Sequence, residues 1–91
     1  MKTIVFFTAD WCKVCKQVLP MFAGIPHEVV NLSDPTKEGR GVAAGVQSLP
    51  TIIVFDEGGA EAYRHSGIIG RSEFNYLLRV AGLEPKQAFA G

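Results

Sequence analysis

The first absence in this sequence is that of net charge. Its nine Lys and Arg residues balance nine Asp and Glu residues over 91 positions. A chain without excess positive charge exerts no long-range attraction on nucleic acid or on an anionic membrane surface. We therefore expect a protein that binds neither nucleic acid nor a membrane.

Long hydrophobic runs are missing as well. The apolar stretch after Lys2 is only a few residues long and leads directly into Asp10 and Trp11. It is shorter than the hydrophobic region of a signal peptide and far shorter than a membrane-spanning helix. We therefore expect a cytoplasmic protein. Because a chain of this length can bury one modest core, we also expect a single domain over residues 1–91, in which residues 83–91 form a tail without a clear pattern.

Cysteine and histidine are scarce. The only cysteines are Cys12 and Cys15, and the two histidines, His27 and His65, are isolated in the sequence. A structural zinc site needs four ligands, and no second ligand pair is present, so we expect no metal and no other cofactor. The two cysteines could also be inert residues of a hydrophobic core. Their spacing, in a chain expected to stay in the cytoplasm, favours a catalytic dithiol over either alternative.

The surroundings of the two cysteines favour a strand, a turn and a helix in that order. Residues 3–7 are β-branched and aromatic, as in a buried strand, and a helical pattern begins at Cys12. Cys12 would then lie at the helix N-terminus, where unpaired backbone N–H groups stabilise a thiolate and lower the pKa of the thiol. The charge of Lys13 adds a small effect of the same sign. Cys15 lies one helical turn further on the same face, close enough to form a disulfide with Cys12.

Two helices are expected in the first half of the chain. The first should cover residues 12–23 and kink at Pro20, which lacks a backbone N–H. Its core-facing positions would be Cys15, Val18, Leu19 and Phe22. The second, over residues 36–44, would be capped by Ser33, with Pro35 in its first turn, and weakened by two internal glycines.

Three further strands and a last helix complete the pattern. The strands are expected at residues 27–32, 51–55 and 60–66, the last two joined by a glycine-containing hairpin turn. The last helix would be capped by Ser72 and end at Gly82. Its buried stripe would comprise Phe74, Leu77, Leu78 and Ala81. The order β-α-β-α-β-β-α predicts an α/β fold with two right-handed parallel crossovers, a hairpin and a closing helix around a four-stranded mixed sheet.

Two blocks of the sequence resemble those of the thioredoxin family. The first is Ala9-Asp10-Trp11-Cys12-x-x-Cys15-Lys16, with Pro20 five residues after the second cysteine. The second is Gly45-Val46-x-Ser48-Leu49-Pro50-Thr51, and Gly67 follows in the final strand region. The resemblance extends over residues 3–81 and implies a thioredoxin-like fold and the activity of a small disulfide reductase.

The resemblance also implies how the site is built and what it meets. It implies that the cysteine pair is exposed beside a cis Leu49–Pro50 peptide bond, and that the Leu49 backbone pairs with an extended substrate segment. The apolar groove around the pair would be shaped by Trp11, Gly67 and Ile68. The implied partners are disulfide-containing proteins and a reductase that regenerates the dithiol, either a flavoprotein thioredoxin reductase or the glutathione system.

The sequence departs from the family pattern at four points. It begins at the core that thioredoxins share with glutaredoxins, without the preceding strand and helix of full-length thioredoxins. Lys13-Val14 replaces the usual Gly-Pro of thioredoxins and the Pro-Tyr of glutaredoxins. Phe6 occupies the position at which thioredoxins bury an aspartate. The glycine-pair and aspartate signature with which glutaredoxins hold glutathione is not evident in residues 67–72.

Together these observations predict a monomeric thiol-disulfide oxidoreductase that reduces protein disulfides. Cys12 would attack the substrate disulfide, and Cys15 would resolve the mixed disulfide that forms. Two alternatives remain open: a glutaredoxin-like redoxin dedicated to one client, such as ribonucleotide reductase, and a non-enzymatic docking module that uses the groove of the fold.

Overall fold

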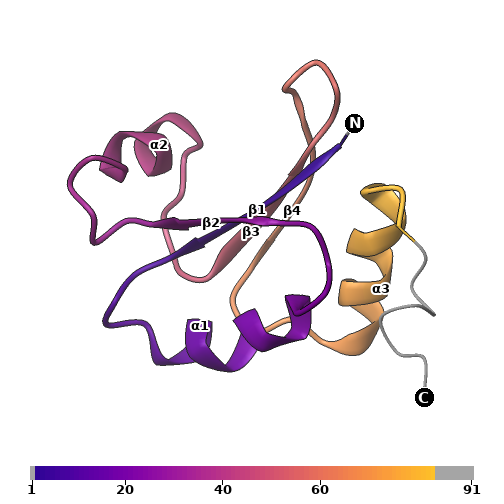
Figure 1. Cartoon of the computed structure of the whole chain (residues 1–91), viewed down its shortest axis with the longest axis horizontal. Helices are drawn as coiled ribbons and strands as arrows, with labels where there is room; N and C mark the ends of the chain where they lie inside the picture. Colours follow the sequence, from indigo (N-terminus) through magenta and orange to yellow (C-terminus); the bar gives the residue numbers. More distant parts are fainter. Residues whose placement is uncertain (1, 84–91) are drawn as a thin grey trace.

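The computed structural model describes residues 2–83 and contains four strands and four helical segments within them. These are β1 (Thr3–Thr8), α1 (Lys13–Val18), the 3₁₀ helix η1 (Leu19–Phe22), β2 (Glu28–Asn31), α2 (Glu38–Ala43), β3 (Thr51–Phe55), β4 (Glu61–Ser66) and α3 (Arg71–Val80). The strands form one mixed sheet in the order β2-β1-β3-β4, which confirms the predicted α/β fold (Figure 1). The tail expected after residue 83 lies outside the described residues.

The central strand β1 separates two hydrophobic clusters, because its side chains alternate between the faces of the sheet. Ile4 and Phe6 pack in one cluster with residues of α1, η1 and α3, whereas Val5 and Phe7 pack in the other, against residues that flank α2. Figure 1 shows α1 and α3 on one side of the sheet and α2 on the other. Strands covered on both faces need apolar residues at every position, which explains the continuous apolar run of β1. Within residues 2–83, no helix has the length and apolar character needed to cross a membrane.

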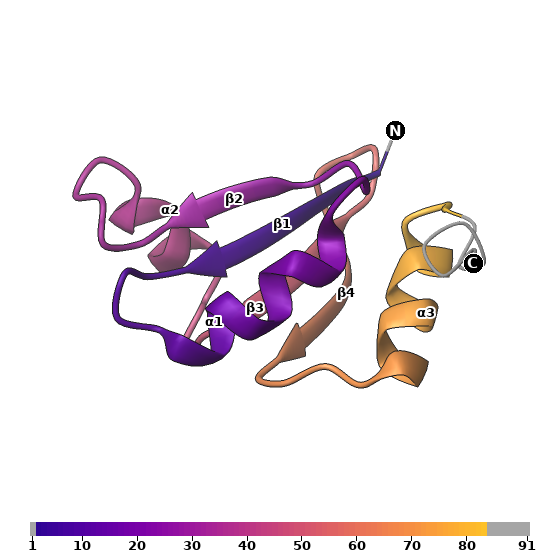
Figure 2. The same ribbon diagram turned by 60° about the horizontal axis from the view of Figure 1, so that its bottom comes forward.

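The predicted helix over residues 12–23 is wrong in its second half. The α-helix α1 ends at Val18, and the chain continues as η1 with Pro20 in its first turn. Pro20 has no N–H to complete an α-helical hydrogen bond, so the chain tightens into 3₁₀ geometry where a kink was expected. The core-facing positions nevertheless match the prediction, since Val18 and Phe22 are buried with Cys15, and Leu19 packs against the same cluster. Figure 2 shows α1 lying across one face of the sheet.

The predicted direction of β3 is also wrong. Only β1 and β2 are parallel; β3 pairs antiparallel with both β1 and β4, so the fold has one parallel crossover and not two. The helix α2 has six residues, and an α-helix of that length spans only about 9 Å. It does not carry the chain back along the sheet, and β3 starts at the same end of the sheet as that at which β2 ends.

Both predicted N-caps, Ser33 for α2 and Ser72 for α3, are wrong. The Asp34 carboxylate accepts bonds from the Thr36 N–H at 2.9 Å and the Thr36 hydroxyl at 2.8 Å, which forms a turn, and α2 begins only at Glu38. Gly70, not Ser72, is the N-cap of α3, because its carbonyl accepts the Phe74 N–H at 2.9 Å. Two smaller differences are that β2 and β4 are one or two residues shorter than expected and that Ala81 is only half-buried.

An ion pair joins α2 to β2. Arg40 on α2 forms a two-pronged interaction with the Glu28 carboxylate, in which the Nη2–Oε1 distance is 3.0 Å. The hydrogen bond from Arg40 lowers the pKa of Glu28 below its ordinary value of 4.5. Both side chains are more than a third exposed, so solvent screens the interaction.

We expect Glu28→Gln to change stability little at neutral pH and more clearly in its acid dependence. A carboxyl whose pKa is lowered on folding stabilises the native state above its unfolded pKa, and this contribution is lost as the pH falls through the folded pKa. The variant should lose less than about 1 kcal/mol at pH 7. Urea titrations at pH 7 and at pH values below 4.5 would test this, since the two proteins should converge in acid. A difference that grows as the pH falls would contradict it.

Candidate active site

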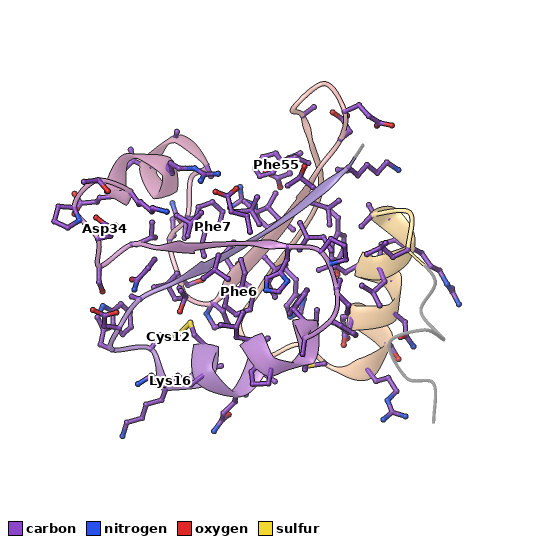
Figure 3. All side chains as sticks on the ribbon, viewed as in Figure 1. Phe6, Phe7, Cys12, Lys16, Asp34 and Phe55 are labelled. Carbon is purple, nitrogen blue, oxygen red and sulfur yellow. A yellow bond between two sulfur atoms is a disulfide. The ribbon has the colours of Figure 1, made fainter. Side chains whose placement is uncertain are left out.

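The two cysteines lie at the start of α1, shortly after the end of β1. Cys12 is the N-cap of α1, and its backbone N–H donates to the Ala9 carbonyl at 3.1 Å, which turns the chain out of the strand. Cys15 lies one helical turn further on, with a Cα–Cα distance of 5.3 Å, and the two residues form a disulfide. Figure 3 shows Cys12 at the start of α1, between this helix and the strand that carries Phe6.

The local geometry distinguishes the two sulfur atoms. The Cys15 backbone N–H donates to Cys12 Sγ at 3.1 Å, so the Cys12 sulfur accepts a hydrogen bond from the first turn of the helix. After reduction, the same N–H would stabilise a negative charge on Cys12. Because α1 has only six residues, this hydrogen bond in its first turn is the specific contact through which the helix would stabilise the charge.

The cysteine pair was expected to be exposed, and the structure corrects this expectation. In the disulfide form Cys12 is 4% exposed and Cys15 1% exposed, and both belong to the cluster that contains Phe6. Ile69 is buried in the same cluster, and Leu49 packs against that cluster. The exposed part of the site is therefore its rim and not the disulfide itself.

The loop that contains Leu49 and Pro50 forms one wall of the site. The Leu49–Pro50 peptide bond is cis, and Pro50 is buried. The Pro50 carbonyl accepts the Gly67 N–H at 2.8 Å, and Gly67 has a φ of +86°, a conformation that favours glycine. The next residue, Ile68, is held through its carbonyl, which lies 2.8 Å from His65 Nε2.

Among the predicted groove residues, Trp11 and Ile68 are exposed. The exposed fraction of the side chain is 73% for Trp11 and 69% for Ile68. Trp11, which directly precedes Cys12 in the sequence, lines a pocket of about 310 Å³ together with Leu49. Pro50 and Gly67 are joined by the hydrogen bond described above.

Sequence reasoning missed most of the lining of this pocket. Its further residues are Ala9, Leu32, Ser33, Val46, Gln47 and Ser48. None of the lining side chains is charged. Leu32 and Ser33 follow β2 and reach the site only through the pairing of β2 with β1, so no local pattern marks them. Val46 and Ser48 belong to the block that carries the family resemblance.

Two features of the site bear on its chemistry. Phe6 is fully buried beside the cysteines, and among the described residues the only buried polar or charged one is Thr51. No carboxylate is therefore buried beneath the dithiol within residues 2–83. Nor does this part of the chain hold a group of three or more His, Cys, Asp or Glu side chains placed to bind a metal ion.

A disulfide closed at the start of the first helix, on a mixed four-stranded sheet, defines a class of dithiol redox proteins. A family profile described as a thioredoxin-like domain matches residues 1–82. The thioredoxin of Mycoplasma pneumoniae is 33% identical over 84 residues, which cover 85% of this chain and 79% of that protein. The thioredoxin of Chlamydia caviae is 30% identical over 84 residues, or 85% of this chain and 76% of that one.

Solved structures agree on the fold. A mutant thioredoxin from Halobacterium salinarum has a TM-score of 0.76 at 19% identity, over 88% of this chain and 74% of that chain. The chain belongs to the thioredoxin-like family, and it is a thiol-disulfide oxidoreductase whose redox-active pair is Cys12 and Cys15. Membership implies disulfide-containing substrates and a partner that supplies electrons.

Proposed function

We propose that this protein reduces disulfides in other proteins, with Cys12 as the attacking and Cys15 as the resolving residue. The Cys12 thiolate attacks one sulfur of the substrate disulfide, and the other substrate sulfur leaves as a thiolate that takes up a proton. Cys15 then loses its proton and attacks Cys12 Sγ. This step releases the second substrate thiol and leaves the Cys12–Cys15 disulfide, so the two electrons of the dithiol pass to the substrate.

The observation that carries this assignment is the hydrogen bond from the Cys15 N–H to Cys12 Sγ. It favours charge on Cys12 and not on Cys15, and the thiolate is the reactive form of cysteine. The exposed apolar rim of Trp11 and Ile68 suits a peptide segment better than a small charged disulfide. The extended segment would pair with the Leu49 backbone, between these two side chains.

The remaining parts of the proposal concern the cellular setting. The protein acts as a cytoplasmic monomer and carries electrons from a reductase to its substrates. The electron donor is either a flavoprotein thioredoxin reductase or glutathione. The docking-module alternative keeps one supporting observation, the uncharged 310 Å³ pocket beside Trp11.

Insulin reduction driven by dithiothreitol tests the proposed activity. The wild-type protein should accelerate the precipitation of insulin B chains, and Cys12→Ser should match the reaction without enzyme, because the remaining Cys15 is almost fully buried and a single thiol cannot complete the dithiol cycle. Circular dichroism would confirm that the variant is folded. Equal rates for the two proteins would favour the docking module. Coupling the assay to thioredoxin reductase and, separately, to glutathione with glutathione reductase would identify the electron donor and recognise a glutaredoxin-like redoxin.

A further inference from the structure

The buried position of Cys15 raises the question of where its proton goes. As the resolving residue Cys15 must become a thiolate, yet it is 1% exposed and packs in the cluster that contains Phe6. Apolar surroundings disfavour the charged form of a thiol. Because no carboxylate is buried among residues 2–83, the proton must leave towards a group at the surface.

A pocket provides such a route. Cys15 lines a pocket of about 330 Å³ that is separate from the one beside Trp11 and has room for several water molecules. Its lining runs from buried Ala9 and Cys15 to exposed Asp10 and Lys16. Thr8, Leu19 and Asn31, contributed by β1, η1 and β2, complete it and are uncharged.

Asp10 is held in place at this pocket by β2 and the residues after it. Its Oδ1 accepts a hydrogen bond from Asn31 Nδ2 at 2.7 Å, and its backbone N–H donates to Ser33 Oγ at 3.0 Å. The Asn31 amide oxygen in turn accepts the Ser33 N–H at 2.9 Å, which fixes the donor. Two strands thus position one carboxylate beside the pocket that Cys15 lines.

We infer that Asp10 is the proton acceptor for Cys15 in the resolving step, through water in this pocket. The inference rests on the proposed function. The Cys15 proton passes by way of water to the Asp10 carboxylate, while Cys15 Sγ attacks Cys12 Sγ and the Cys12–substrate sulfur bond breaks. The departing substrate thiolate takes up a proton from solvent, and the Asp10 carboxylic acid returns its proton to water. Lys16, the other charged residue at the pocket, is a cation and cannot accept the proton, although its charge favours the Cys15 thiolate.

The reaction of the reduced protein with dithiobis(nitrobenzoate), followed by stopped-flow absorbance, separates the two steps. The first coloured thiolate is released by Cys12 at a rate proportional to reagent concentration, and the second by Cys15 at a rate independent of it. Asp10→Asn keeps the acceptor oxygen for Asn31 but cannot take up a proton. We expect it to slow the second phase at least about tenfold at pH 7 and to leave the first within about twofold. Its second phase should also rise more steeply with pH, because hydroxide replaces the carboxylate.

Two further variants exclude a merely structural effect. Asp10→Glu should restore most of the second-phase rate, and Glu57→Gln, which removes a negative charge at the exposed hairpin turn, should change neither phase. A second phase in Asp10→Asn that equals the wild-type rate, or that is too fast to separate from the first, would overturn the inference. Absence of the first phase in the wild-type protein would instead refute the proposed function.

Discussion

Cys15→Ser is expected to capture substrate covalently, whereas Cys12→Ser is expected to capture none. Without Cys15 the mixed disulfide on Cys12 has no resolving thiol, so the reduced variant incubated with a disulfide protein should hold about one substrate chain per molecule. In Cys12→Ser, the remaining Cys15 is almost fully buried and lacks the N–H bond that stabilises charge on Cys12. Non-reducing gels and intact-protein mass spectrometry would measure both adducts.

The comparison contains its own control, since each variant retains one cysteine and differs only in which sulfur remains. Dithiothreitol should release the captured chain from Cys15→Ser. Capture through Cys15 in Cys12→Ser, at a rate similar to that of the other variant, would reverse the assignment of attacking and resolving residues. Such a result would also mean that the first turn of α1 opens after reduction and makes Cys15 more exposed than it is in the disulfide form.

The parts of the site that the sequence predicts are those set by local geometry. Cys12 and Cys15 are one helical turn apart, so their proximity follows from helix geometry alone. The buried runs of β1 and β3 were predictable for a similar reason, because a strand covered on both faces needs apolar residues throughout. Family resemblance added Trp11 and Leu49, which line one pocket in the structure.

The parts that the sequence does not predict depend on contacts between distant segments. The direction of β3 is set by its antiparallel pairing with β1, a contact between distant segments that the weak helical pattern of residues 36–44 does not reveal. Gly41, which looks like a defect in that helix, is buried, and a Cβ there would lie 2.8 Å from Leu32 Cδ1. The absence of a side chain at Gly41 therefore permits α2 to pack closely against Leu32. Asn31 meets Asp10 only because β2 pairs with β1, so the link between them has no local signature.

The aromatic cluster at the end of η1 provides the largest expected effect on stability. Phe22 is fully buried, with ring centroids 5.6 Å from Phe6 on β1 and 5.0 Å from Phe74 on α3, both in edge-to-face geometry. Its ring also lies 5.5 Å from that of His27. One side chain thus joins the segment after the catalytic helix to the central strand and to the last helix.

Phe22→Ala should lower the free energy of unfolding by about 3–5 kcal/mol, because it removes apolar burial, leaves a cavity and breaks two aromatic contacts. Small domains are stable by only about 5–15 kcal/mol, so a large part of the margin would be lost and Tm should fall by more than about 10 °C. Urea and thermal unfolding followed by circular dichroism measure this loss. Val42→Ala, at a position that is 77% exposed on α2, is the control and should change stability by less than about 0.5 kcal/mol. A loss below about 1 kcal/mol for Phe22→Ala would mean that neighbouring side chains close the cavity and that this cluster does not hold η1 against the sheet.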